Sequence, residues 1–288
     1  MESARHIRRP DGTTIGYRIE RAPDRRPLLV MIHGLASNLT RWSEFVEYTR
    51  LRHDWDLLRI DLRGHGTSMV RGRIGMDLWC EDLSAVLKEE GYDTATIVGH
   101  SLGAQVGVHF HSRHPSSVTA LIMIDPVFPE NLSGRLLKAR RMRWVLWAVV
   151  WKLRVLNSLG LRRTAFPMRD LRALDEKTRK TLADNPEIEI GDLYTNPIVD
   201  LEYMPVANYL QDLVEVTRPL PPLEKIDVPV LVLLSAGASV SNPERNLAMI
   251  DRMPHVEVRT IEANHWLLTE RPREAREAIE HWCVGLFA

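Results

Sequence analysis

The sequence predicts an α/β protein in which a mostly parallel central sheet is covered by helices on both faces. Short strand-like runs alternate with longer helical patterns over most of the 288 residues, which is typical of βαβ units. Residues 28–32 form a continuous apolar run, as expected for a strand buried on both faces of a parallel sheet. The alternation stops near Pro129 and resumes near Pro219, which indicates an inserted helical segment.

The elements of the predicted sheet follow in order along the chain. The first two strands, at residues 5–9 and 14–20, flank the turn signal Asp11-Gly12, and a helix at 76–90 ends at Gly91, a common stop signal. The other expected strands span residues 28–32, 57–60, 94–98, 118–124, 230–234 and 256–261. The other expected helices span residues 42–50, 102–112, 243–252 and 267–282.

The inserted segment divides the chain into a discontinuous core, residues 1–128 and 218–288, and a helical cap, residues 129–217. The charge of the cap is unevenly distributed along its sequence. Residues 131–169 contain ten basic and no acidic residues, whereas residues 170–215 contain eleven acidic and four basic ones, a balance of −7. We expect the cap to cover and shape the site that the core provides.

Composition narrows the classes of protein that the chain can represent. Thirty-eight basic residues balance 38 acidic ones, so no overall field attracts nucleic acid. The longest apolar run, residues 144–151, is far shorter than the ~20 residues that span a bilayer, and the N-terminus lacks the apolar region of a secretory signal. Cys80 and Cys283 form neither a disulfide framework nor a metal-binding spacing. We expect a soluble cytoplasmic protein without metal or cofactor, and the sequence does not indicate its oligomeric state.

The strongest chemical signal is the segment Gly99-His100-Ser101-Leu102-Gly103, which fits G-x-S-x-G where a buried strand ends and a helix begins. A serine on such a sharp turn takes strained backbone angles and brings neighbouring backbone close, so the residues two positions away must be small. Gly99 and Gly103 meet this requirement. Because the bare motif also occurs by chance, the alternative is a glycine-rich helix start without catalytic meaning.

Three further segments accompany this motif. His33-Gly34 follows the third strand, the segment DLRGHGTS (61–68) follows the fourth, and Ala263-Asn264-His265-Trp266 follows the last strand. With these four motifs in order, the sequence resembles the α/β-hydrolase superfamily, in its capped esterase- and lipase-like branch. The resemblance implies the α/β-hydrolase fold, with Ser101 as nucleophile and His265 as its base.

The same resemblance implies an oxyanion hole. Its two donors are the backbone N–H groups of Leu35, which follows His33-Gly34, and Leu102, which follows the nucleophile. The alternative is that His33-Gly34 only turns the chain. We interpret residues 61–68 as a structural loop and His65 as non-catalytic.

The acid that orients the histidine is the uncertain member. In most relatives an Asp follows the strand that corresponds to residues 230–234, but here Ser239 stands there and no Asp or Glu occurs before Glu244. Some superfamily members carry the acid after the preceding strand, where this chain has Asp125. Asp125 is the first choice, and Glu130, Glu244 or no carboxylate are the alternatives.

The expected reaction is hydrolysis of a carboxylic ester through a seryl acyl intermediate. Trp144 and Trp147, in the apolar run of the cap, are expected to bind an apolar short- or medium-chain acyl group, unless they only anchor the cap. The basic residues around this run could also contact a membrane surface. A thioesterase or C–C bond hydrolase would share the same three catalytic residues, and a non-enzymatic receptor for a small ligand would need only the fold and the cap.

Overall fold

The sheet at the centre of the fold has eight strands, in the spatial order β1-β2-β4-β3-β5-β6-β7-β8. The computed structural model describes residues 2–194, 196–237 and 243–286. Only β2 runs antiparallel to its neighbours, and all other pairs are parallel. The strands are β1 (Ser3–Arg8), β2 (Thr14–Glu20), β3 (Leu28–Ile32), β4 (Asp56–Ile60), β5 (Ala95–His100), β6 (Val118–Ile124), β7 (Val230–Ser235) and β8 (Val256–Ile261).

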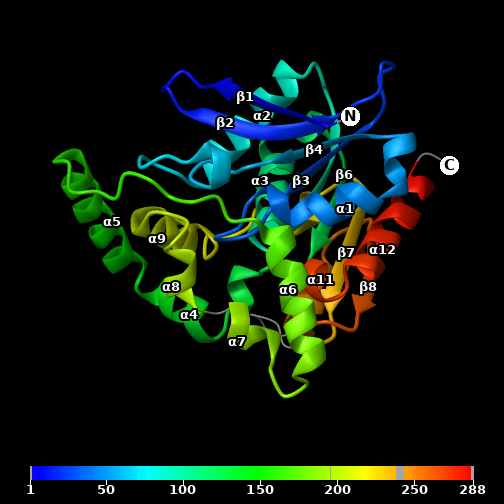
Figure 1. The fold of residues 1–288 in the computed structure, drawn as a ribbon. Helices are drawn as coiled ribbons and strands as arrows, with labels where there is room; N and C mark the ends of the chain where they lie inside the picture. Colours follow the sequence, from blue (N-terminus) through cyan, green and yellow to red (C-terminus); the bar gives the residue numbers. More distant parts are fainter. Residues whose placement is uncertain (1, 195, 238–242, 287–288) are drawn as a thin grey trace.

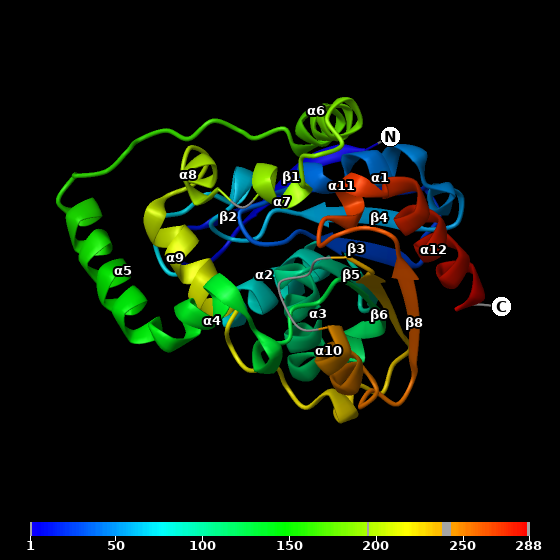
Figure 2. The same ribbon diagram turned by 90° about the horizontal axis from the view of Figure 1, so that it is seen from below.

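Helices cover both faces of this sheet (Figure 2). Alternate residues of the central strands point to opposite faces, so Val30 packs with the helices of one face and Met31 with those of the other. One face is covered by α2 (Met76–Glu89), α3 (Leu102–Arg113) and α10 (Pro243–Ile250). The other is covered by α1 (Ser43–Tyr48) and α12 (Pro272–Gly285). The predicted α/β class, with helices on both faces of a mostly parallel sheet, is confirmed.

Two expected helices are interrupted in the structure. The helix expected at 267–282 is divided into α11 (Leu267–Glu270) and α12, because Pro272 has no N–H to continue the hydrogen-bond ladder of α11. The helix expected at 42–50 is α1 followed by a separate 3₁₀ turn, η2 (Arg50–His53), and it is preceded by another, η1 (Leu39–Trp42).

Between β6 and β7 the described chain contains helices and no strand (Figure 1). We call residues 129–217 the helical insertion. Its helices are α4 (Gly134–Arg141), α5 (Arg143–Ser158), α6 (Leu171–Asp184), α7 (Ile190–Tyr194), α8 (Pro197–Asp200) and α9 (Val206–Glu215). Across the described residues, no helix combines the length and apolar character needed to cross a bilayer.

Parallel topology brings the ends of several strands to one edge of the sheet. His33 follows β3, Ser101 follows β5, Asp125 follows β6, and His265 lies in the loop after β8. Because the carboxyl ends of parallel strands share an edge, residues that are up to 232 positions apart in the sequence meet there.

Candidate active site

Ser101 lies on the sharp turn between β5 and α3. Its φ of 54° and ψ of −115° are strained for a residue with a side chain, and they hold Ser101 at the start of the helix. A Cβ on Gly103 would lie 2.4 Å from the carbonyl oxygen of Ile32, and one on Gly99 would lie 2.2 Å from the backbone of Gly103. The two glycines of the motif are therefore required by close backbone approach, as their spacing predicts.

The side chains of Ser101, His265 and Asp125 form one hydrogen-bonded chain. His265 Nε2 lies 3.0 Å from Ser101 Oγ, and His265 Nδ1 lies 2.5 Å from Asp125 Oδ2. All three residues are buried. This order of contacts, hydroxyl to imidazole to carboxylate, is the arrangement in which an imidazole can take a proton from a serine.

The Asp125 carboxylate is held from two sides. Its Oδ1 accepts hydrogen bonds from the backbone N–H of Ser235, at 3.1 Å, and from the Ser235 hydroxyl, at 2.8 Å. Burial raises the pKa of Asp125, but the His265 and Ser235 hydrogen bonds outweigh it, so its pKa lies below the ordinary value. Asp125 is therefore an anion at neutral pH, directed at the His265 N–H.

His100 fixes the loop that carries His265. Its Nε2 donates to the backbone carbonyl of His265 over 2.9 Å. Burial, and after it the neighbouring His265, lower the pKa of His100 to about 3. His100 is therefore neutral at physiological pH, and the hydrogen bond places its proton on Nε2.

The two expected oxyanion donors lie beside Ser101. Leu102 is the first residue of α3, so its N–H has no acceptor within the helix. Leu35 follows Gly34, whose missing Cβ would lie 3.5 Å from the Cβ of Ser101. Leu35 and Ser101 line the same cavity.

That cavity has a volume of about 220 Å³, and core and helical insertion both contribute to its wall. Its lining combines apolar, aromatic and charged residues. The apolar and aromatic ones are Leu35, Ala36, Val127, Leu136, Leu171, Tyr194, Tyr209, Leu213, Val216 and Trp266. Its Arg and Asp residues are Arg41, Arg135, Arg169 and Asp200.

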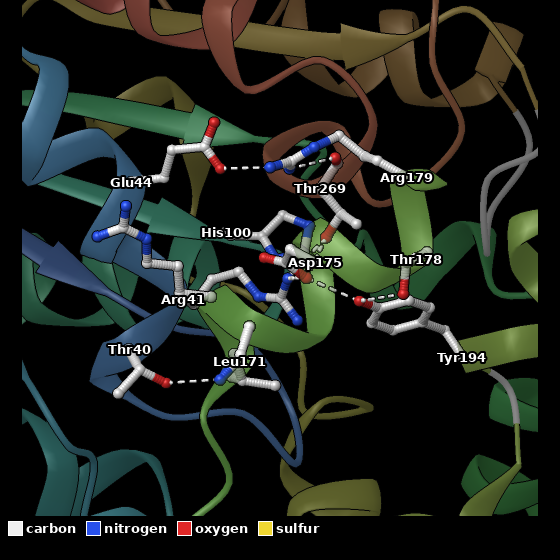
Figure 3. Close-up of polar contacts among 12 residues, drawn as sticks. Thr40, Arg41, Glu44, His100, Leu171, Asp175, Thr178, Arg179, Tyr194 and Thr269 are labelled. Carbon is white, nitrogen blue, oxygen red and sulfur yellow. Dashed lines mark hydrogen bonds and ion pairs between the residues drawn. The ribbon is translucent and has the colours of Figure 1, made fainter. Parts of the chain in front are cut away.

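Arg41 is a cavity residue that the sequence did not single out. It is only 8% exposed, and its guanidinium donates to the Asp175 carboxylate of α6 and, over 2.6 Å, to the Thr269 hydroxyl. The Tyr194 hydroxyl donates to the same carboxylate over 2.7 Å (Figure 3). Burial opposes the charge of Arg41, but Asp175 holds its pKa above the ordinary value. Partners 134 and 228 positions away leave no local pattern by which sequence reasoning could find Arg41.

We call Arg41, Asp175, Tyr194 and Thr269 the Arg41 cluster. This cluster is one of several links between α6 and the segment that follows Leu35. The Thr40 hydroxyl accepts from the N–H of Leu171 over 3.0 Å, and Arg179 of α6 contacts Glu44 of α1 over 2.8 Å (Figure 3). The Asn38 amide donates to the carbonyl of Arg169 over 2.8 Å. The start of α6 is thus bound to the loop that carries the expected oxyanion donor Leu35.

The structure does not bring Trp144 and Trp147, the residues expected to bind the acyl group, to the cavity that contains Ser101. Trp144 is 73% exposed, and the Trp147 ring lies 6.0 Å from the guanidinium of Arg154. Neither residue lines the cavity that contains Ser101. The reason is the orientation of α5, which buries Val150 and turns Trp144 toward solvent.

The remaining candidates lie elsewhere. His65 of the 61–68 loop contacts Asp212 of α9 over 2.8 Å rather than Ser101. Glu130 is exposed at the start of the helical insertion. Ser239 and the side chain of Glu244 lie outside the described residues. Within the described ranges, no group of three or more His, Cys, Asp or Glu side chains is arranged to hold a metal ion.

Comparison with known proteins gives relatives of similar sequence over part or most of the chain. The chain is 22% identical to the sn-1-specific diacylglycerol lipase ABHD11 of Mus musculus, over 88% of this chain and 80% of the relative. It is 28% identical to epoxide hydrolase 3 of Xenopus tropicalis, but over only 43% of this chain, and it spans about a third (34%) of that protein.

Among solved structures, a thermophilic esterase from Thermogutta terrifontis, solved with malate bound, superposes with a TM-score of 0.68 and 21% identity. The match covers 99% of this chain and 100% of the esterase. At this level of identity the likeness shows the fold alone.

A family model covers most of the chain. The model described as Serine aminopeptidase, S33 matches residues 23–272, from just before β3 to the start of α12. The matched range contains the Ser101 turn, Asp125, the helical insertion and the His265 loop. The chain therefore belongs to this hydrolase family, within the α/β-hydrolase superfamily.

Proposed function

We propose that the protein is a serine hydrolase that cleaves carboxylic esters, with Ser101 as nucleophile, His265 as general base and Asp125 as the orienting acid. The observation that carries the proposal is the 3.0 Å contact between Ser101 Oγ and His265 Nε2, two residues that line the cavity. The neighbouring contact between His265 Nδ1 and Asp125 supports it. Relatives named as esterases and lipases support the choice of an ester.

The reaction has two halves. Ser101 Oγ attacks the ester carbonyl while its proton passes to His265 Nε2, and the carbonyl oxygen becomes an anion facing the N–H groups of Leu35 and Leu102. The C–O bond then breaks, and the leaving alcohol takes the proton from His265. Water repeats the sequence on the acyl-serine, releasing the carboxylic acid and restoring the Ser101 hydroxyl.

The helical insertion, residues 129–217, acts as the cap of this site, over a core of residues 1–128 and 218–288. Leu136, Leu171, Leu213 and Val216 contribute its apolar wall. A volume of about 220 Å³ is below the range of roughly 300–1,000 Å³ that holds drug-sized ligands. The cavity therefore suits a short apolar acyl group, in the lower part of the short-to-medium range expected from the sequence.

Hydrolysis of p-nitrophenyl esters with acyl chains of two to twelve carbons tests the proposal. We expect the highest kcat/KM for the shortest chains, and loss of turnover in Ser101→Ala. Aminoacyl p-nitroanilides and acyl thioesters, tested in parallel, report an aminopeptidase or a thioesterase. Higher kcat/KM for either of those, or ester turnover that survives Ser101→Ala, would contradict the proposal.

A further inference from the structure

The outward face of α5 is an apolar stripe in contact with solvent. Trp144, Ala148, Trp151, Val155 and Leu159 follow one another at positions i, i+4, i+7, i+11 and i+15, which places them on one side of the helix and its end. Trp144 is 73% exposed, Trp151 69% and Leu159 72%. We call these five residues the α5 stripe.

The opposite side of α5 already has its partner within the fold. Val150 is completely buried there, and α5 packs along α9. The guanidinium of Arg154 donates to the side-chain oxygen of Gln211 on α9. Both views of the ribbon place α5 at the outer margin of the molecule, with α9 between it and the sheet (Figures 1 and 2). The α5 stripe is therefore not a core surface of this chain.

The segment that carries the stripe is basic, and several of its basic side chains are exposed. Residues 131–169, which contain all of α4 and α5, include ten basic residues and no acidic one. Arg141, Arg143 and Lys152 are exposed on these two helices. A surface that joins exposed tryptophans to basic side chains fits a partner that is apolar inside and anionic outside.

We propose that α5 docks the protein on the surface of a bilayer that contains anionic lipid. The α5 stripe enters the boundary between headgroups and acyl chains, and the surrounding Arg and Lys side chains contact the phosphate and carboxylate groups. With sixteen residues, α5 is about 24 Å long, so it lies along the surface instead of crossing the ~30 Å hydrocarbon layer.

Charge separates this occupant from a second copy of the chain. Two α5 stripes pressed together would bring two regions of purely basic charge into proximity, and no acidic residue of this segment would compensate them. Anionic lipid headgroups, in contrast, attract these basic side chains, so docking on a bilayer brings no such repulsion. Docking goes beyond the proposed ester hydrolysis and does not depend on it, so its test measures binding and not turnover.

The test is co-sedimentation of the full-length chain with vesicles of phosphatidylcholine containing 30% phosphatidylserine, at low salt. We expect most of the protein in the pellet, at least tenfold less with pure phosphatidylcholine or at high salt, and a similar loss for Trp144→Ser/Trp151→Ser. The matched control is Val284→Ser, which removes a 66% exposed apolar side chain from α12 and should bind like the wild type.

Folding is checked by the thermal unfolding midpoint, which the exposed substitutions should leave unchanged. Equal sedimentation of the wild type and the double-tryptophan variant would overturn the proposal, as would a wild type that stays in the supernatant. A concentration-dependent dimer in solution, abolished by the same pair of substitutions, would also overturn it in favour of a second copy of the chain.

Discussion

The two helices α3 and α5 are similarly apolar, yet they occupy opposite environments. Every residue of α3 from Leu102 to His111 is buried, whereas Val150 is the one buried residue of α5. The small residues of α3 explain the difference, because Gly103 and Gly107 let the helix approach β3 and β5 closely. On α5, the large side chains of Trp144 and Trp151 do not pack against a strand and are exposed to solvent. Apolar content alone does not place a helix in the core.

The largest effect should follow from Asp125→Asn, beside the N-terminus of α3. An amide at this position offers an N–H to His265 Nδ1 in place of an acceptor, so the imidazole takes the wrong tautomer. We expect kcat on the preferred ester to fall by a factor on the order of 10³ to 10⁴, with an unchanged circular dichroism spectrum.

Glu130→Gln is the matched control for this variant, because Glu130 is exposed on the same connection and should leave kcat near the wild-type value. Near-normal turnover by Asp125→Asn would remove Asp125 from the mechanism. A large loss of kcat in Glu130→Gln would make Glu130 the candidate acid in place of Asp125.

A pair of truncations compares the two helices directly. Phe110 of α3 is fully buried, so Phe110→Ala should lower the free energy of unfolding by about 3–5 kcal/mol. Trp144→Ala on α5 removes a larger side chain, but it should change the free energy of unfolding by less than about 0.5 kcal/mol because Trp144 is exposed. Urea denaturation measures both, and Phe110→Leu serves if the alanine variant does not fold. Similar losses for Phe110→Ala and Trp144→Ala would mean that α5 is packed.

The pH dependence of stability gives a smaller effect on α3. Burial, followed by the charges of Arg218 and Arg113, lowers the pKa of His109 to about 4, against about 6.5 in an unfolded chain. Between these values the unfolded state binds more protons, so the stability from His109 is complete above pH 6.5 and is lost as pH falls toward 4.

His109→Gln removes this dependence. From pH 7 to 5.5 the wild type should lose about 1.2 kcal/mol more of its unfolding free energy than the variant, as measured by urea titration at both pH values. Other histidines titrate in both proteins, so the difference isolates His109. Equal losses in the two proteins would contradict the low pKa.

Local patterns explain what the sequence could predict. The turn at Ser101 is specified within five residues, because Gly99 and Gly103 must lack side chains for this backbone to form. Asp125 and His265 were predicted from the resemblance to the α/β-hydrolase superfamily, and both follow parallel strands that end at one edge of the sheet. The interruption between α11 and α12 was not predicted, although Pro272, its cause, is visible in the sequence.

The helical insertion was harder to predict. An apolar run on all sides of a helix does not specify which side packs against α9, so Trp144 and Trp147 were assigned to the cavity. The Arg41 cluster depends on Asp175 and Thr269, which only the complete fold brings together. Long-range ion pairs of this kind have no periodic signal in a single sequence.

The most direct test of the central claim is covalent labelling by an organophosphorus ester, followed by mass spectrometry of the peptides. The mechanism predicts one adduct, on Ser101, together with complete loss of ester turnover. Ser101→Ala should take up no label, and Ser112→Ala, which removes an exposed hydroxyl from the same helix, should be labelled like the wild type. An unlabelled Ser101 in protein that still hydrolyses esters would contradict the account.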